Sequence, residues 1–271
     1  MTLVSTEWLS KNLNKVKIID ASWHLVKNRN AIEEYNKEHI KNAIFFDLDK
    51  NSNQEKSLPH GHFLPSITSH EKSISKMGIL NTDRIIIYCY SDLISSCRAW
   101  FQFLYFGHNP KLISVLNGGM KKWKLEGRKV TNSKTKLISK KYKAKENSNM
   151  IKIKSQIDKN IKRKEFTILD ARSKNRFLGL ESEPRIGIKS GSIKGSKSLP
   201  LNALINIKDN TFLDKKKLKD IFNLKGINTD KIVMSCGSSV SASSLALAYS
   251  VINDDYMPKI YVGSWTEYGK K

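Results

Sequence analysis

Two short apolar runs, residues 85–88 (Ile-Ile-Ile-Tyr) and 232–234 (Ile-Val-Met), lie at similar positions in the two halves of the chain. Neither run alternates with polar residues, which is typical of parallel strands buried on both faces. A mostly apolar stretch follows each run, at 98–104 and at 243–249, and we predict that both stretches are helical. The pattern therefore predicts a buried strand followed by a helix in each half.

The second half of the chain repeats four landmarks of the first half in the same order, which predicts a duplicated domain. Each copy alternates strands and helices, as expected of an α/β domain with a mostly parallel sheet flanked by helices. Between the copies, a polar, lysine-rich stretch with weak periodicity predicts a linker that lies across the surface. The paired segments are 16–22 and 166–172, 38–44 and 191–197, 78–89 and 226–236, and 118–123 and 263–268. We predict a first, non-catalytic domain over 1–128, a linker over 129–149 and a catalytic domain over 150–271.

Length and composition agree with this division. A chain of 271 residues is long enough for two domains of about 120 residues, each with its own core. No apolar run reaches the roughly 18 residues that a membrane span needs, and the N-terminus lacks a secretory signal, so we expect a soluble, cytoplasmic protein with no membrane partner. Three cysteines, Cys89, Cys97 and Cys236, are too few for a disulfide framework and form no zinc motif, so we expect a reduced compartment and no metal.

The chain is strongly basic, with 48 Lys and Arg against 25 Asp and Glu and a formal charge of +23. Clustered cations would indicate a nucleic-acid site. Here the lysines are spread through nearly every segment. We therefore expect a solvated basic surface that attracts anionic substrates, and we do not expect nucleic acid as a partner.

Cys236 is the candidate nucleophile. It follows the second apolar run and precedes the second predicted helix, at the carboxyl edge where ligands bind to open α/β sheets. A helix N-terminus favours the thiolate, and the small residues at 237–241 allow backbone N–H groups to surround an anion. A phosphatase with a similar loop would need an arginine six residues after the cysteine, and Ala242 occupies that position. We therefore expect a persulfide carrier in preference to phosphate chemistry.

The duplicated organisation, the Asp-Ala pairs that follow an early strand and the loop Cys-Gly-Ser-Ser-Val-Ser-Ala together resemble the rhodanese superfamily, and within it the tandem-domain 3-mercaptopyruvate sulfurtransferases. The resemblance covers nearly the whole chain, including Phe45-Phe46-Asp47, Arg98-Ala99-Trp100 and the segment 263–267. It implies two tandem rhodanese-like domains and an enzyme that needs no metal or organic cofactor. The uncharged loop favours the mercaptopyruvate branch over thiosulfate sulfurtransferases.

The resemblance also implies roles for individual residues. The segment 176–185 is similar to a family stretch whose arginines bind the donor, so Arg176 and Arg185 become the substrate-binding pair. A relay would combine Ser238 with an acid and a histidine from the first half, for which the matches are Asp49 and either His60 or His62. The remaining expected contacts with the substrate come from the loop residues Gly237, Ser239, Val240 and Ser241.

Two positions depart from the family pattern. Ser239 stands where the family has a second glycine, and its Cβ meets a tight turn that can require glycine geometry. Cys89 occupies the position in the first copy that corresponds to Cys236, but the loop after it is longer and Asp92 would oppose a thiolate. We interpret Cys89 as a cysteine without a role in the reaction.

The predicted reaction moves sulfur from 3-mercaptopyruvate, a small 2-oxo thiol, to Cys236 and then to a thiol acceptor such as thioredoxin, or to cyanide, with release of pyruvate. Three alternatives remain open. They are thiosulfate as the donor, a non-catalytic sulfur carrier or binding protein, and delivery of sulfur to RNA.

Overall fold

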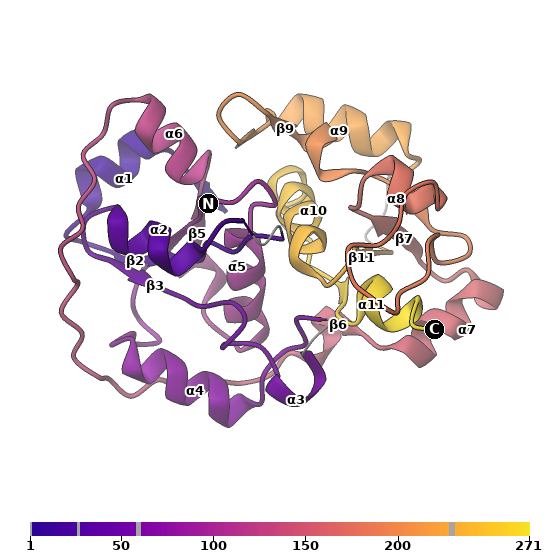
Figure 1. Cartoon of the computed structure of the whole chain (residues 1–271), viewed down its shortest axis with the longest axis horizontal. Coiled ribbons are helices and arrows are strands. Elements are labelled where there is room, and N and C mark those ends of the chain that lie inside the picture. Colours follow the sequence, from indigo (N-terminus) through magenta and orange to yellow (C-terminus); the bar gives the residue numbers. More distant parts are fainter. Residues whose placement is uncertain (1, 26–27, 58–60, 228–230) are drawn as a thin grey trace. The chain divides into compact units, whose positions relative to one another are not determined.

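The computed structural model describes residues 2–25, 28–57, 61–227 and 231–271 and shows two compact units (Figure 1). The first unit contains residues 1–52, 64–147 and 206–212, and the second contains 53–63, 148–205 and 213–271. Segment 53–63 thus clusters with the second unit, although it lies early in the chain. The predicted domain and linker boundaries, 1–128, 129–149 and 150–271, stay a prediction.

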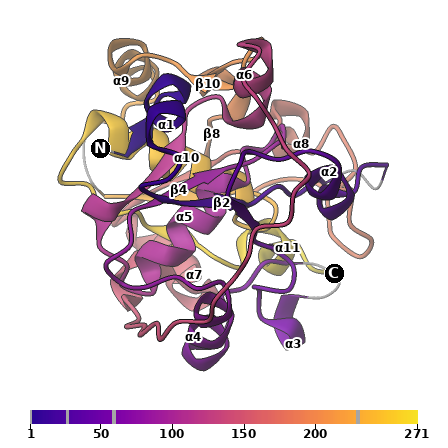
Figure 2. The same cartoon turned by 90° about the vertical axis from the view of Figure 1, so that its left-hand side faces the viewer.

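The first unit is built on a five-stranded parallel sheet in the order β1-β5-β4-β2-β3. Helix α5 packs on β4 and β5, and α1 packs beside α6. Figure 2 shows α1 and α6 on one side of this sheet and α4 and α5 on the other. Its elements are β1 (Leu3–Val4), α1 (Thr6–Asn12), β2 (Lys17–Asp20), α2 (Ala31–Lys37), β3 (Ala43–Phe45), α4 (Ile67–Lys76), β4 (Ile85–Tyr88), α5 (Ser96–Tyr105), η1 (Pro110–Leu112), β5 (Ile113–Leu116) and α6 (Gly119–Leu125).

The second unit repeats this sheet in the order β6-β12-β11-β7-β8, again parallel. Counted by rank along the chain, the sheet strands of the two units follow the same order, as a duplicated domain requires. The elements from residue 148 onward are η2 (Ser148–Met150), β6 (Ile151–Lys152), α7 (Lys154–Arg163), β7 (Thr167–Asp170), α8 (Lys174–Leu178), β8 (Lys197–Ser198), η3 (Leu201–Leu204), β9 (Ile205–Asn206), β10 (Thr211–Phe212), α9 (Lys215–Leu224), β11 (Ile232–Ser235), α10 (Val240–Ile252), β12 (Ile260–Tyr261) and α11 (Ser264–Tyr268). Helix α3 (Gln54–Ser57) lies in the segment from the first half that joins this unit.

The predicted strands and helices are present. Both apolar runs form fully buried strands, β4 and β11, and the helices that follow them, α5 and α10, are also buried. Strands without an exposed face are built mostly from apolar residues, which explains why these runs do not alternate; the polar Ser235 at the end of β11 is also buried. Among the described residues, no helix is long and apolar enough to cross a membrane.

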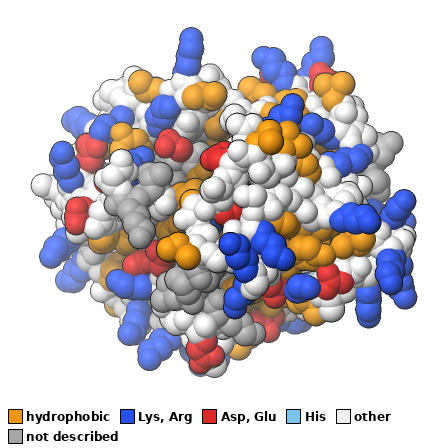
Figure 3. All heavy atoms as spheres, turned by 45° about the vertical axis from the view of Figure 1, so that its right-hand side comes forward, with side chains coloured by type: hydrophobic (Ala, Val, Ile, Leu, Met, Phe, Trp, Pro, Cys, Tyr) orange, Lys and Arg blue, Asp and Glu red, His pale blue; other side chains and the backbone are white. Residues whose placement is uncertain are grey.

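Basic side chains are dispersed over the face of the molecule shown in Figure 3, with acidic side chains between them. This agrees, for that face, with the expectation that the charge of +23 is spread over the surface.

Candidate active site

Cys236 lies at the carboxyl end of β11, directly before the turn into α10. The strand is buried along its whole length, and the first eleven residues of the helix are buried too. These two apolar elements fix the short loop between them, and the Cys236 side chain is only 2% exposed. The predicted position at a strand-to-helix turn is confirmed.

The loop reaches the helix through Ser239, which adopts a left-handed backbone conformation with φ of 65°. This is the conformation that glycine adopts without strain, so the expectation that a serine here meets a tight turn is confirmed. The Ser239 side chain donates a 3.4 Å hydrogen bond to the carbonyl oxygen of His62, and its own carbonyl accepts from Ser243. These contacts hold the residue in a conformation that costs free energy.

A second turn, at the start of α11, makes hydrogen bonds to the loop. Cys236 N donates to Ser264 Oγ (3.3 Å), and Cys236 O accepts from Trp265 N (2.9 Å). Gly237 O accepts from Thr266 N at 2.9 Å. In the sequence this turn was a repeat landmark and part of the family resemblance, and nothing in its residue types indicated that it supports the cysteine loop.

The remaining backbone N–H groups of the loop are available to a ligand. Within the described part of the chain, no acceptor takes the N–H of Gly237, Ser238 or Ser239. Val240 and Ser241 begin α10, where N–H groups have no partner inside the helix. Anions bind to such arrangements of N–H groups, as predicted for this loop.

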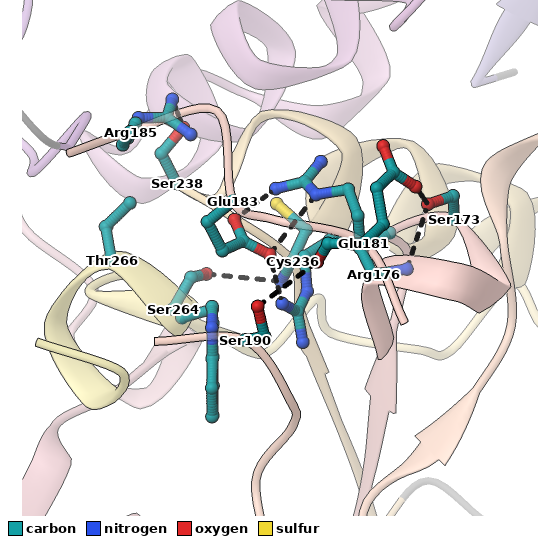
Figure 4. Close-up of polar contacts among 12 residues, drawn as sticks. Ser173, Arg176, Glu181, Glu183, Arg185, Ser190, Cys236, Ser238, Ser264 and Thr266 are labelled. Atoms are coloured by element: carbon teal, nitrogen blue, oxygen red, sulfur yellow. Dashed lines mark hydrogen bonds and ion pairs between the residues drawn. The ribbon is translucent and has the colours of Figure 1, made fainter. Parts of the chain in front are cut away.

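Two arginines lie against the loop at Gly237. A Cβ placed on Gly237 would lie 3.2 Å from Arg185 Nη1 and 3.3 Å from Arg176 Nη2, so a larger residue would displace both guanidinium groups. Arg185 Nη2 also donates to Ser238 Oγ at 2.9 Å. Arg176 comes from α8, which ends at Gly179 in a left-handed conformation, and the chain then turns back to supply Arg185 (Figure 4). The structure thus brings the predicted arginine pair to the residue next to Cys236.

Glu183 holds Arg176 in place. Its buried carboxylate accepts from Arg176 Nη2 (2.6 Å) and Nε (3.2 Å), and also from Arg172 Nη1 (2.7 Å). Arg172 in turn makes a buried ion pair with Asp170 at 2.7 Å. Burial disfavours the charge on Arg172, but Asp170 and Glu183 outweigh this, and the pKa of Arg172 is raised. Neither Glu183 nor Arg172 was predicted to be a site residue, although Glu183 directly precedes Pro184-Arg185 in the segment that contains the arginine pair.

His62 lies beside the loop as well. Its Nδ1 is 2.9 Å from Ser238 Oγ, and the side chain is 4% exposed. Segment 53–63 belongs to the same compact unit as Cys236, so this contact is internal to that unit. His60, the alternative histidine, lies outside the described residues.

Asp49, the predicted acid of the relay, belongs to the first unit. There its carboxylate accepts a 3.0 Å hydrogen bond from the indole nitrogen of Trp23. Its part in a relay with Ser238 stays a prediction.

Cys89, the counterpart of Cys236 in the first unit, has a different environment. The residue is 5% exposed, and its thiol donates to Ser96 Oγ at 3.3 Å. Burial raises the pKa of Cys89, which disfavours the reactive thiolate. Cys89 O accepts from Met120 N just as Cys236 O accepts from Trp265 N, so the backbone arrangement is repeated without an activated thiol.

No group of His, Cys, Asp or Glu side chains in the described ranges could hold a metal ion. The chemistry that the residues of this site offer is that of a buried thiol beside two guanidinium groups, a hydroxyl and an imidazole.

Relatives that span nearly the whole chain are named as sulfurtransferases. An Arabidopsis thaliana protein named thiosulfate/3-mercaptopyruvate sulfurtransferase 1, mitochondrial, is 36% identical over 98% of this chain and 75% of its own length. Mouse 3-mercaptopyruvate sulfurtransferase and bovine thiosulfate sulfurtransferase are each 32% identical, over 98% of this chain and 91% of their own. These matches confirm the prediction of a sulfurtransferase enzyme of this group.

The fold agrees with the sequence matches. The crystal structure of SseA from Escherichia coli, described as a 3-mercaptopyruvate sulfotransferase, superposes with a TM-score of 0.86 at 27% identity over 98% of this chain and 99% of that chain. The rhodanese-like domain matches residues 5–126 and again residues 154–271. The chain therefore belongs to the rhodanese-like family and contains two copies of its domain.

Proposed function

We propose that the chain transfers sulfur from 3-mercaptopyruvate to a thiol acceptor through a persulfide on Cys236. The observation that carries this proposal is the position of Arg176 and Arg185 against Gly237, the residue after the cysteine. A guanidinium group binds a carboxylate through two parallel hydrogen bonds and keeps its charge at all physiological pH values. Two of them beside a thiol suit a donor that carries a carboxylate, a carbonyl oxygen and a sulfur atom within three carbons.

The first step breaks one bond and forms another. The Cys236 thiolate attacks the sulfur of 3-mercaptopyruvate, an S–S bond forms, and the C–S bond breaks with its electron pair on carbon. The product is the enolate of pyruvate, which takes up one proton. The loop N–H groups of Gly237, Ser238 and Ser239 then face the persulfide anion.

Ser238 and His62 supply this proton. Arg185 Nη2 donates to one lone pair of Ser238 Oγ, and His62 Nδ1, 2.9 Å away, donates to the other when it carries a hydrogen, which leaves the hydroxyl hydrogen free to point at the enolate. A proton can therefore pass from the imidazole to the hydroxyl and from the hydroxyl to the enolate. The role of Asp49 in orienting the histidine is part of the same proposal.

In the second step, an acceptor thiolate attacks the outer sulfur and restores the Cys236 thiolate. We propose a dithiol protein such as thioredoxin as the acceptor, with cyanide as a substitute in assays. Reduction of the isolated persulfide by thioredoxin, followed through the thioredoxin disulfide, tests this acceptor.

Thiosulfate is the second candidate donor, because mouse and bovine relatives that match this chain equally well carry different donor names. The absence of a basic residue in the loop favours 3-mercaptopyruvate, since thiosulfate is a dianion without a carboxylate. Steady-state kcat/KM values with each donor decide the question, and a higher value with thiosulfate would refute the choice of mercaptopyruvate.

Mass spectrometry tests the persulfide itself. After 3-mercaptopyruvate is mixed with the protein, we expect about 32 Da, one sulfur atom, on the peptide that contains Cys236. No adduct, or an adduct on Cys89 alone, would favour a non-catalytic binding protein. For the location in the cell we propose the cytoplasm, which fractionation tests directly.

A further inference from the structure

We infer that a basic hollow in the first unit binds an organic anion with several phosphate groups. The hollow has a volume of about 770 Å³ and lies where the strands of the first sheet begin. Lys15 and Lys17 come from the start of β2, Lys41 precedes β3, and Arg84 precedes β4. Cys89 follows the other end of β4, so the basic hollow and the cysteine position of this unit lie at opposite edges of the sheet.

The stretch predicted to be a linker forms the other wall of the basic hollow, and hydrogen bonds fix it there. Thr131 pairs with His39 in an antiparallel bridge, and Thr135 Oγ1 donates to the carbonyl oxygen of Ala43 at 2.7 Å. Further along, Lys140 N donates to Ser75 O at 2.9 Å. The wall is therefore part of the folded unit, and its lysines belong to the lining of the hollow.

Positive charge is concentrated in the basic hollow far beyond the composition of the chain. The segment adds Lys134, Lys136 and Lys140, which makes six lysines and Arg84 in the lining against one acid, Asp83. The ratio of basic to acidic residues is about two in the whole chain, with 48 against 25, and seven in the lining of the hollow. This local cluster corrects the expectation that basic residues are merely dispersed.

These charges are not neutralised within the protein. In the ranges that the structure describes, none of the seven cations of the hollow takes part in an ion pair, and the buried Nε of Arg84 has no hydrogen-bond partner. The Asp83 carboxylate accepts instead from Leu80 N at 2.8 Å. A concave surface of one charge sign concentrates anions near it.

The size and the apolar part of the lining limit the ligand. A volume of this order suits one small molecule. Val16, Ile44, Met77 and Leu137 provide apolar surface between the cations, which suits a ligand with an apolar or ring-containing body. No aromatic side chain among the described residues lines the hollow, and single-stranded nucleic acids usually need such stacking surfaces. A nucleoside triphosphate and a coenzyme with a phosphorylated nucleotide share the required chemistry.

Isothermal titration of the full chain at low salt with ATP, coenzyme A and inorganic tripolyphosphate tests the inference. We expect ATP or coenzyme A to bind more tightly than tripolyphosphate. The triple variant K41Q/K134Q/K136Q should weaken that binding about tenfold or more, because it removes charge-assisted contacts to phosphate. All three lysines are exposed, so the fold should tolerate the changes, which circular dichroism and unchanged sulfur transfer check.

The matched control is K159Q/K162Q/K219Q, which removes three exposed lysines of the second unit and the same total charge. We expect it to change the dissociation constants less than twofold. Equal weakening in both triple variants would show unspecific attraction and overturn the inference. So would no binding at millimolar ligand, equal binding of all three probes, or binding by an RNA oligonucleotide alone.

Discussion

Replacing Glu183 with glutamine tests whether the buried carboxylate positions Arg176 for the sulfur donor. Glutamine has the same shape but no charge, so it removes the anion that Arg172 and Arg176 share. A hydrogen bond to a charged group contributes about 1.5–3 kcal/mol, and Arg176 makes two of them with Glu183. A residual neutral acceptor recovers part of this. We therefore expect a loss of about 2–3 kcal/mol in transition-state stabilisation, which lowers kcat/KM roughly 30- to 150-fold.

The assay is the steady-state formation of pyruvate from 3-mercaptopyruvate with a dithiol acceptor. Because Arg176 would act on the donor, we expect a rise in KM together with a fall in kcat, whereas the second step, measured from preformed persulfide, should change less than threefold. Unfolding in urea should also show destabilisation by about 3 kcal/mol, since one partner of a buried ionic network is lost. Rates are compared only at temperatures where circular dichroism shows a folded variant.

Glu181 offers a matched control two residues away. It is exposed and its carboxylate accepts only a 3.3 Å hydrogen bond from Ser173 among the contacts of the described residues, so E181Q makes the same chemical change at the surface. We expect its kcat/KM to stay within twofold of the parent value. A kcat/KM for E183Q within threefold of the parent would refute the positioning role, and so would an equal loss in E181Q.

Three further predictions concern single residues. R185K should lower kcat/KM about 100-fold, because lysine cannot bind a carboxylate through two parallel hydrogen bonds. A loss in kcat/KM of less than fivefold, measured by pyruvate formation, would contradict this. S239G should stabilise the protein by about 1 kcal/mol in urea unfolding, because glycine adopts the φ of 65° without strain; a destabilised variant would show that the side-chain contact with His62 outweighs it. Burial, with a smaller contribution from the charge of His108, lowers the pKa of His70 to about 3, so protons bind preferentially to the unfolded chain below pH 6.5. The free energy of unfolding should be at its full value above pH 6.5 and about 2 kcal/mol lower at pH 5, with a weaker dependence on pH in H70Q. The same dependence on pH in both proteins, measured by urea unfolding, would refute the assignment to His70.

The strands, the repeat and the cysteine position could be predicted because each leaves a local signal. A strand buried on both faces is built mostly from apolar residues, and residues 85–88 of β4 and 232–234 of β11 show this directly. The arginine pair could be predicted only because segment 176–185 is similar to a segment of the family. The residue type alone does not indicate whether an arginine faces a binding site or the solvent.

Contacts between residues far apart in the chain left no such signal. The approach of His62 to Ser238 spans 176 positions, and the sequence could not distinguish it from His60. The support of the cysteine loop by Ser264 and Trp265 depends on how α11 packs. The linker lysines were interpreted as a solvated stretch, because the hydrogen bonds that fix residues 131–140 to the first unit come from segments remote in sequence.

The two copies differ in the charges around a buried aspartate that both contain. In both, an aspartate ends the second strand of the domain and is buried, Asp20 in β2 and Asp170 in β7. In the first copy Ser22 donates to Asp20 through its N–H and hydroxyl, and burial raises the pKa of Asp20 because these hydrogen bonds, that of Tyr88 and the charge of His39 offset it only in part.

In the second copy Arg172 takes the place of Ser22. Its guanidinium group neutralises Asp170 and extends to Glu183, which in turn holds Arg176 against the cysteine loop. A buried cation can join two carboxylates, whereas a serine hydroxyl satisfies only one. With Ser22, the buried aspartate makes hydrogen bonds within a local turn. With Arg172, it belongs to a network of ion pairs that reaches the candidate active site.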